Sequence, residues 1–143
     1  MEHGAVSKEN LKEVCFVVGR TYGVRNLGRL LYEVTLVASD AGRRKSRYGG
    51  VCSISFERWQ RMLAHSDIYE YRKEILKAFG IDLKRITFTE LAKNPQLSLL
   101  ITAAWFLANC DAIPKHRVGR AEVFSKWWFH MPLGQYMHLT EDK

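Results

Sequence analysis

Several signals that would place a chain in a special class are missing from these 143 residues. No apolar run approaches the ~18 residues that are needed to cross a bilayer. The N-terminal stretch 1–10 is polar, whereas a secretory signal peptide has a basic start followed by a hydrophobic segment. We therefore expect neither a transmembrane helix nor a signal peptide.

Cysteine is also scarce. The chain has three cysteines, Cys15, Cys52 and Cys110, an odd number without the Cys-x-x-Cys spacing of metal sites and redox motifs. The five histidines also lack the spacing of zinc ligands. We expect no disulfide framework, no zinc site and no cofactor, and we interpret Cys15 and Cys110 as small core residues.

What the chain does contain is typical of one basic globular domain. Hydrophobic residues make up 47% of it and charged residues 26%, and its length suits a single core spanning residues 1–143. Lys and Arg together number 22 against 15 for Asp and Glu, which gives a net charge of +7. This charge favours an anionic partner, either nucleic acid, a membrane surface or an acidic polymer of a bacterial cell wall.

Apolar residues recur with helical spacing along most of the chain, and capping residues mark the ends of the segments. The expected helices run from Ser7 to Gly23 within an N-terminal unit 1–25, from Asn26 to before Gly42, from Ser55 to His65, from Asp67 to Gly80, around Leu91, from Asn94 onward, and from after Pro114 until Pro132 and Gly134. These segments predict a mostly α fold of about six helices, in which the helix after Pro95 is the most buried. The tail 135–143 is polar and is expected to be loose.

Helical periodicity stops between Gly42 and Ser55. This stretch carries four basic residues, then Tyr48-Gly49-Gly50 and a short β-prone run, so we expect a basic loop with at most a small hairpin. Guanidinium groups match the geometry of carboxylate and phosphate groups, and such a loop can hold an anionic polymer. The alternative is an ordinary solvated loop.

Two stretches carry a resemblance to a known family. The first has the segments TLVASDAG (35–42), RYGGVCSIS (47–55) and FERW (56–59) in the order helix end, glycine-containing loop, aromatic helix. The second has Asn94-Pro95, an aromatic helix with WFL (105–107), a break at Ile113-Pro114 and the segment KWWFHMPLG (126–134).

This order resembles the lysozyme-like superfamily, in the branch of phage and bacterial lytic transglycosylases and of small lysozyme-like proteins that accompany phage tail genes. On this alignment Ser39 occupies the position of the catalytic glutamate, and Asp40 that of the serine that usually follows it. Ser53-Ile54-Ser55 stands where the family has a glutamine-containing triplet. The resemblance implies a lysozyme-like helical domain that degrades peptidoglycan as a muramidase or lytic transglycosylase.

Cleavage of a glycosidic bond requires a carboxylic acid beside the leaving oxygen. Glu33 and Asp40 are the only acidic residues on the second expected helix or at its end, and their seven-residue spacing puts them on one side of it. They are the candidate catalytic residues. The alternative is that Glu33 is a solvated residue on the flank of the helix and that Asp40 makes only local contacts.

The candidate substrate-binding residues are Arg47, Tyr48, Gly49 and Ser53 of the basic loop, together with Trp105. An exposed tryptophan ring can stack on a sugar, although the helical spacing of Trp105 also fits a core position. The expected partner is peptidoglycan or another anionic polymer.

Two other functions remain open from the sequence. An inactive lysozyme-like domain would serve as a structural or binding protein, with phage structural proteins or a host protein as its partner. A basic nucleic-acid-binding module would act through the loop, although no nucleic-acid motif is recognisable. Without a signal peptide, we expect the chain in the host cytoplasm or in a phage virion, and we expect it to reach the periplasm only by another route.

Overall fold

The computed structural model describes residues 8–141, so the helix cap predicted at Ser7 lies outside the described residues. The predicted mostly α fold is confirmed. The helices are α1 (Lys8–Tyr22), α2 (Leu27–Ser39), α3 (Phe56–Ala64), α4 (Ser66–Phe79), a 3-10 turn (Leu83–Arg85), α5 (Phe88–Lys93), α6 (Pro95–Asn109), α7 (Arg117–Trp127) and α8 (Leu133–Leu139). No strand occurs between residues 8 and 141, and the stretch 42–55, for which at most a small hairpin was expected, is a loop of turns and bends.

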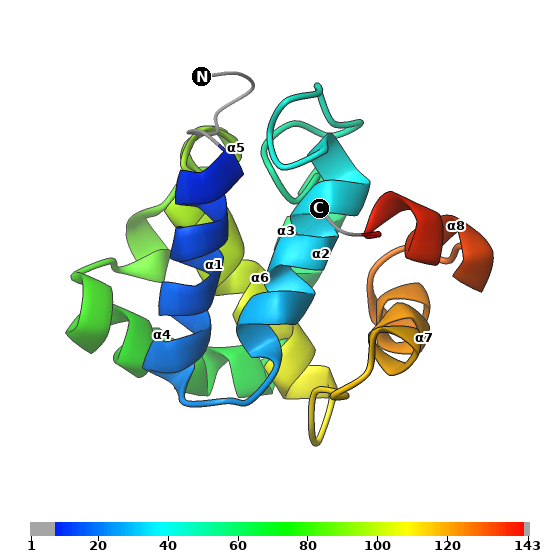
Figure 1. The fold of residues 1–143 in the computed structure, drawn as a ribbon. Coiled ribbons are helices and arrows are strands. Elements are labelled where there is room, and N and C mark those ends of the chain that lie inside the picture. The colour runs from blue at the N-terminus through cyan, green and yellow to red at the C-terminus, as the bar shows by residue number, and fades with distance from the viewer. Residues whose placement is uncertain (1–7, 142–143) are drawn as a thin grey trace.

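Helices α1 and α2 form an antiparallel pair at the front of the molecule (Figure 1). A glycine on each helix lets the two backbones approach closely. A Cβ atom on Gly19 would lie 2.7 Å from the backbone nitrogen of Gly28, and one on Gly28 would lie 3.0 Å from Cα of Phe16. Real Cβ contacts are essentially never as short as the one at Gly19, and the one at Gly28 would be tight, so a side chain at Gly19 would push the helices apart and one at Gly28 would require its neighbours to shift.

Helix α6 is central, since it packs against α1, α2, α4 and α5. The sequence predicted that α6 would also be the most buried helix, and this prediction is wrong. Nine of its 15 residues are buried, whereas 11 of the 13 residues of α2 are buried, Glu33 among them. The prediction was wrong because α8 packs against the side of α2 that carries polar residues, which the sequence pattern assigns to solvent.

The predicted caps are confirmed at three helices. Side chains of Ser55, Thr87 and Asn94 accept hydrogen bonds from the backbone N–H groups that open α3, α5 and α6. The predicted cap at Asn26 is wrong. This residue has a left-handed conformation (φ 68°), and its side-chain amide instead donates to the carbonyl oxygen of Ile113 at 3.1 Å, which ties the start of α2 to the segment before α7.

The C-terminal segment differs from the expected loose tail. Pro132 does not end the polypeptide's last helix but precedes α8, and Gly134 lies within that helix. Tyr136 of α8 is fully buried and Thr140 is buried as well. The polar composition of this segment suggested mobility, but one aromatic side chain in the core is enough to fix it against α2 and α7.

Candidate functional site: a basic pocket beside a buried ion pair

The carboxylate of Glu33 lies in a buried polar network between α2, α7 and α8. Arg120 donates two hydrogen bonds to it, from Nε to Oε1 at 2.8 Å and from its terminal nitrogen to Oε2 at 2.9 Å. Tyr136 donates a third from its hydroxyl to Oε1 at 2.8 Å. Burial, strengthened by the nearby Glu33 charge, raises the pKa of Tyr136 well above its usual value, so this hydroxyl remains a donor.

The partner guanidinium is also fully engaged. The side chain of Arg120 is 8% exposed and that of Glu33 3%. The remaining terminal nitrogen of Arg120 donates to the carbonyl oxygen of Lys115 at 2.6 Å. Every strong contact of Glu33 is therefore with a donor, in a two-pronged ion pair whose charges are balanced. This arrangement fixes three helices and offers no proton to an outside ligand.

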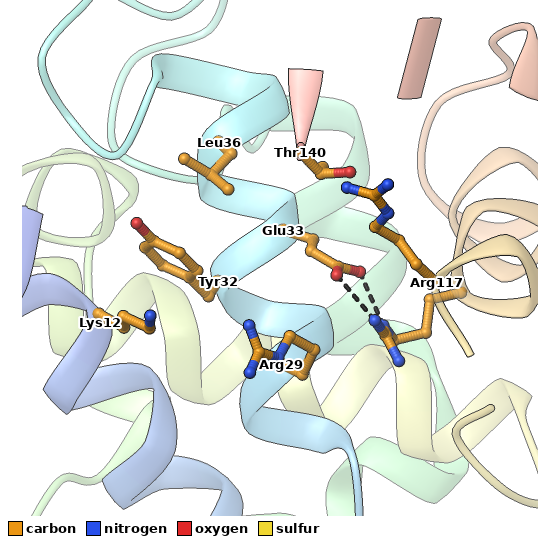
Figure 2. A pocket seen from close by; sticks show the side chains of 8 residues that line it. Lys12, Arg29, Tyr32, Glu33, Leu36, Arg117 and Thr140 are labelled. Atoms are coloured by element: carbon orange, nitrogen blue, oxygen red, sulfur yellow. Dashed lines mark hydrogen bonds and ion pairs between the residues drawn. The ribbon is translucent and has the colours of Figure 1, made fainter. Parts of the chain in front are cut away.

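A pocket of about 370 Å³ opens beside this ion pair. It is lined by Lys12 of α1, by Arg29, Tyr32, Glu33 and Leu36 of α2, by Arg117 and Arg120 of α7, and by Thr140. Figure 2 shows Lys12 on the α1 side of α2, Arg29 at its front and Arg117 beside Thr140 on the opposite side.

The pocket carries a surplus of positive charge. Arg120 neutralises Glu33, whereas Lys12, Arg29 and Arg117 form no ion pair within residues 8–141. Lys12 and Arg117 are half-buried and Arg29 is exposed. Lys12 lies over the ring of Tyr32, with Nζ 5.2 Å from the ring centre, and Arg29 lies over the ring of Phe16. Three cations on three helices thus face one concave surface, which favours an anionic ligand.

One polar atom of the pocket lining lacks a partner. Tyr32 is 1% exposed, and its hydroxyl is buried without a hydrogen bond to any described residue. A buried hydroxyl without a partner costs free energy. In Figure 2 it points away from Glu33, on the side of α2 that faces α1 and Lys12.

The second candidate acid, Asp40, lies apart from this pocket. It follows the last residue of α2 in a left-handed conformation (φ 49°), and Arg43 donates to its Oδ1 at 2.9 Å. Its side chain is 43% exposed. The structure therefore does not bring Glu33 and Asp40 together: one is sealed in the interior, and the other makes a local surface ion pair.

The basic loop is held by buried hydroxyl groups. Ser39, at the end of α2, accepts a hydrogen bond from the backbone N–H of Gly42 and donates to the carbonyl oxygen of Val51, each at 2.9 Å. Ser53 is buried, and its hydroxyl accepts from the backbone N–H of Tyr48 at 3.1 Å. Both contacts serve the loop itself.

The other predicted substrate-binding residues of the loop lie near one another. The guanidinium of Arg47 stacks over the ring of Tyr48, which is 39% exposed and contacts Phe129. Gly49 has a left-handed conformation (φ 87°) that favours glycine and turns the chain. This group does not contribute to the basic pocket beside Glu33.

Trp105 serves the packing of α6 against the end of α7. Its indole N–H donates to the carbonyl oxygen of Trp127 at 2.8 Å, and the edge of His65 meets its ring. The guanidinium of Arg58 also donates to that carbonyl and to the one of Trp128, over whose ring it lies at 4.4 Å. Burial lowers the pKa of Arg58 to about 10, helped by the charge of Arg61.

Sequence reasoning missed most of the residues that line the pocket, namely Lys12, Arg29, Tyr32, Arg117 and Arg120, and it also missed Tyr136, which donates to Glu33. One signal was present: Arg29 and Glu33 are four residues apart on one helix, a spacing typical of an ion pair. That pair does not form, because Arg120 takes the carboxylate from the other side.

Within residues 8–141 no cluster of three or more His, Cys, Asp or Glu side chains is placed to hold a metal ion. None of the helices in that range has the length and apolar character that a membrane span requires.

Comparisons with protein-family models, with curated proteins and with solved structures found no match to this chain.

Proposed function

We propose that this protein is a non-catalytic binding protein that recognises an acidic polymer of the bacterial cell wall without cleaving it. The observation that carries the proposal is the state of Glu33. A general acid must hold a proton and face its substrate. Glu33 faces two donors of Arg120 and one of Tyr136, and it is 3% exposed.

The same geometry supports binding. The ion pair joins α2 to α7, and the Tyr136 hydroxyl joins α8 to the same carboxylate. The three cations of the pocket are therefore mounted on helices that are held together before any ligand arrives. Such preorganisation reduces the ordering cost of binding. The net charge of +7 adds a long-range attraction for an acidic polymer.

The resemblance to lysozyme-like proteins fits this proposal if the chain is a lysozyme-like domain that lacks the catalytic glutamate. On that alignment the catalytic position holds Ser39, whose hydroxyl is committed to the loop. The remaining acid of this region, Asp40, is paired with Arg43 at the surface. Ser39 has no carboxyl group, and the carboxyl group of Asp40 is engaged by Arg43 rather than directed into the pocket.

The test combines two measurements on insoluble cell walls that retain their phosphate-bearing polymers. We expect the protein to sediment with the walls and to be released by salt, because the attraction is electrostatic. We expect no loss of turbidity and no soluble glycan fragments. Clearing of the suspension that Asp40→Asn abolishes would overturn the proposal in favour of a hydrolase, and a failure to sediment at low salt would overturn it outright. Asp40 is exposed, so this variant is expected to fold.

A further inference from the structure

We infer that the pocket between α1, α2 and α7 is a binding site for a phosphate group, and that this is the group through which the protein recognises its ligand. The inference rests on the proposed function only for the source of the phosphate, which is either a terminal phosphate of a wall polymer or a free phosphate monoester.

The first argument is the number and placement of the charges. Lys12, Arg29 and Arg117 approach the pocket from three different helices, and none forms an ion pair within residues 8–141 (Figure 2). A carboxylate has two oxygens in one plane and is satisfied by a single guanidinium. A phosphate monoester has three outer oxygens directed to different sides and carries close to two charges, so it can accept from donors on more than one of these helices.

The second argument is that Glu33 does not oppose an anion. Its charge is matched by Arg120, with both carboxylate oxygens in hydrogen bonds. The pair is locally neutral and leaves the charge of the other three residues uncompensated. A structural carboxylate here has a further effect: it holds α7, and with it Arg117, in place opposite Arg29.

The third argument is the hydroxyl of Tyr32. Tyr32 lines the pocket, and its hydroxyl is buried, has no hydrogen-bond partner among the described residues and points away from Glu33 toward the α1 side (Figure 2). A ligand oxygen at the α1 end of the pocket would accept from it, with Lys12 as the neighbouring cation. The free energy that the unpaired hydroxyl costs in the empty protein would then be recovered on binding.

The experiment is calorimetric titration at low ionic strength with inorganic phosphate, glycerol phosphate and acetate. We expect saturable binding of both phosphates and none of acetate. Arg29→Gln and Arg117→Gln should each weaken phosphate binding about tenfold, the loss expected for one charge-assisted hydrogen bond. Arg61→Gln and Lys45→Gln remove the same unit charge from exposed residues outside the pocket and should change it little. Absence of saturable binding, equal binding of acetate, or an equal loss in the control variants would overturn the inference.

Tyr32→Phe separates a ligand contact from a structural role. It should weaken phosphate binding several-fold and at the same time raise the melting temperature of the free protein, because it removes an unsatisfied buried hydroxyl. A higher melting temperature with unchanged phosphate affinity would show that the hydroxyl does not face the ligand and would remove this argument.

Cell walls stripped of their phosphate polymers distinguish the two proposals. If the protein sediments equally with stripped walls and does not bind phosphate, the phosphate site fails and wall binding stands. If it binds phosphate but sediments with neither preparation, the wall proposal fails and the site stands for a free phosphate ester.

Discussion

The two sides of helix α2 are packed in different ways. Toward α1 the contact is close apolar packing. Gly19 and Gly28 allow the two backbones to approach each other, and apolar side chains fill the space around them. Toward α7 and α8 the contact is polar, and it centres on the carboxylate of Glu33. One helix is thus buried by two unrelated means.

The comparison separates stability from specificity. Apolar packing gains free energy from the area removed from water and tolerates some variation in the residues that supply it. A buried ion pair costs desolvation for both charges and returns it only when every donor and acceptor is in place. We expect the apolar side to tolerate exchanges among its apolar side chains, apart from Gly19 and Gly28, and the polar side to favour one arrangement of α7 and α8.

The largest expected effect follows from breaking the polar side. Arg120→Met leaves the charge of Glu33 buried without its partner, and we expect the free energy of unfolding to fall by about 3–5 kcal/mol. Urea denaturation monitored by circular dichroism measures it. Changing Glu33 and Arg120 together to methionine should restore most of the loss, because no charge then remains unpaired.

An exposed ion pair provides the control for that prediction. Arg20 and Glu13 are 3.8 Å apart with side chains 67% and 73% exposed. Arg20→Met should change stability by less than about 0.5 kcal/mol. Similar losses for Arg20→Met and Arg120→Met would show that the buried pair has no special importance.

A smaller effect is expected on the apolar side. Gly19→Ala places a methyl group 2.7 Å from the backbone of α2, and the helices must separate to accept it. We expect a loss of about 1–3 kcal/mol, measured as for Arg120. A Cβ atom on Gly134 of α8 would have no neighbour within 4 Å, so Gly134→Ala should leave the free energy of unfolding unchanged or raise it by about 0.5–1 kcal/mol. A loss at Gly134 as large as at Gly19 would contradict the close-packing argument.

The smallest expected effect is a fall in the free energy of unfolding at alkaline pH. Burial raises the pKa of Cys52 from 9.0 to about 12 and also raises that of Cys15, both on the side toward α1 and α6. The thiols stay protonated in the folded protein but ionise in the unfolded chain. Their contribution to stability is therefore complete below about pH 9 and is lost as the pH rises toward 12, by up to roughly 1.4 kcal/mol per pH unit for each thiol.

The measurement is the free energy of unfolding in urea at a series of pH values. Tyr136, on the polar side, adds a loss of the same sign only above about pH 10, the ordinary pKa of tyrosine. Tyr22, Tyr32 and Tyr71, whose pKa values burial also raises, add to the loss in the same range. Cys52→Ala should reduce the slope between pH 9 and 10 and leave the tyrosine contribution. A slope that Cys52→Ala does not alter would assign the alkaline loss to other groups.

The local features of this fold could be predicted from the sequence, and the site could not. Caps at Ser55, Thr87 and Asn94 depend on residues three positions apart, so they are visible in the sequence itself. The partners of Glu33 lie 87 and 103 positions away along the chain. No periodicity connects them, and α8 was missed because its seven residues are too few for a helical pattern and begin directly after Pro132, with Gly134 among them.

The hydroxyl of Ser39 has a consequence for any attempt to give this chain a new activity. This fully buried hydroxyl connects the end of α2 to the start of the following loop at Gly42 and to its later part at Val51. A glutamate there would have to find room for two more carbons and a charge, and it would release the loop that it is meant to work beside. In this architecture a reactive acid at the helix end and an anchored loop exclude each other, so the two would have to be redesigned as one unit.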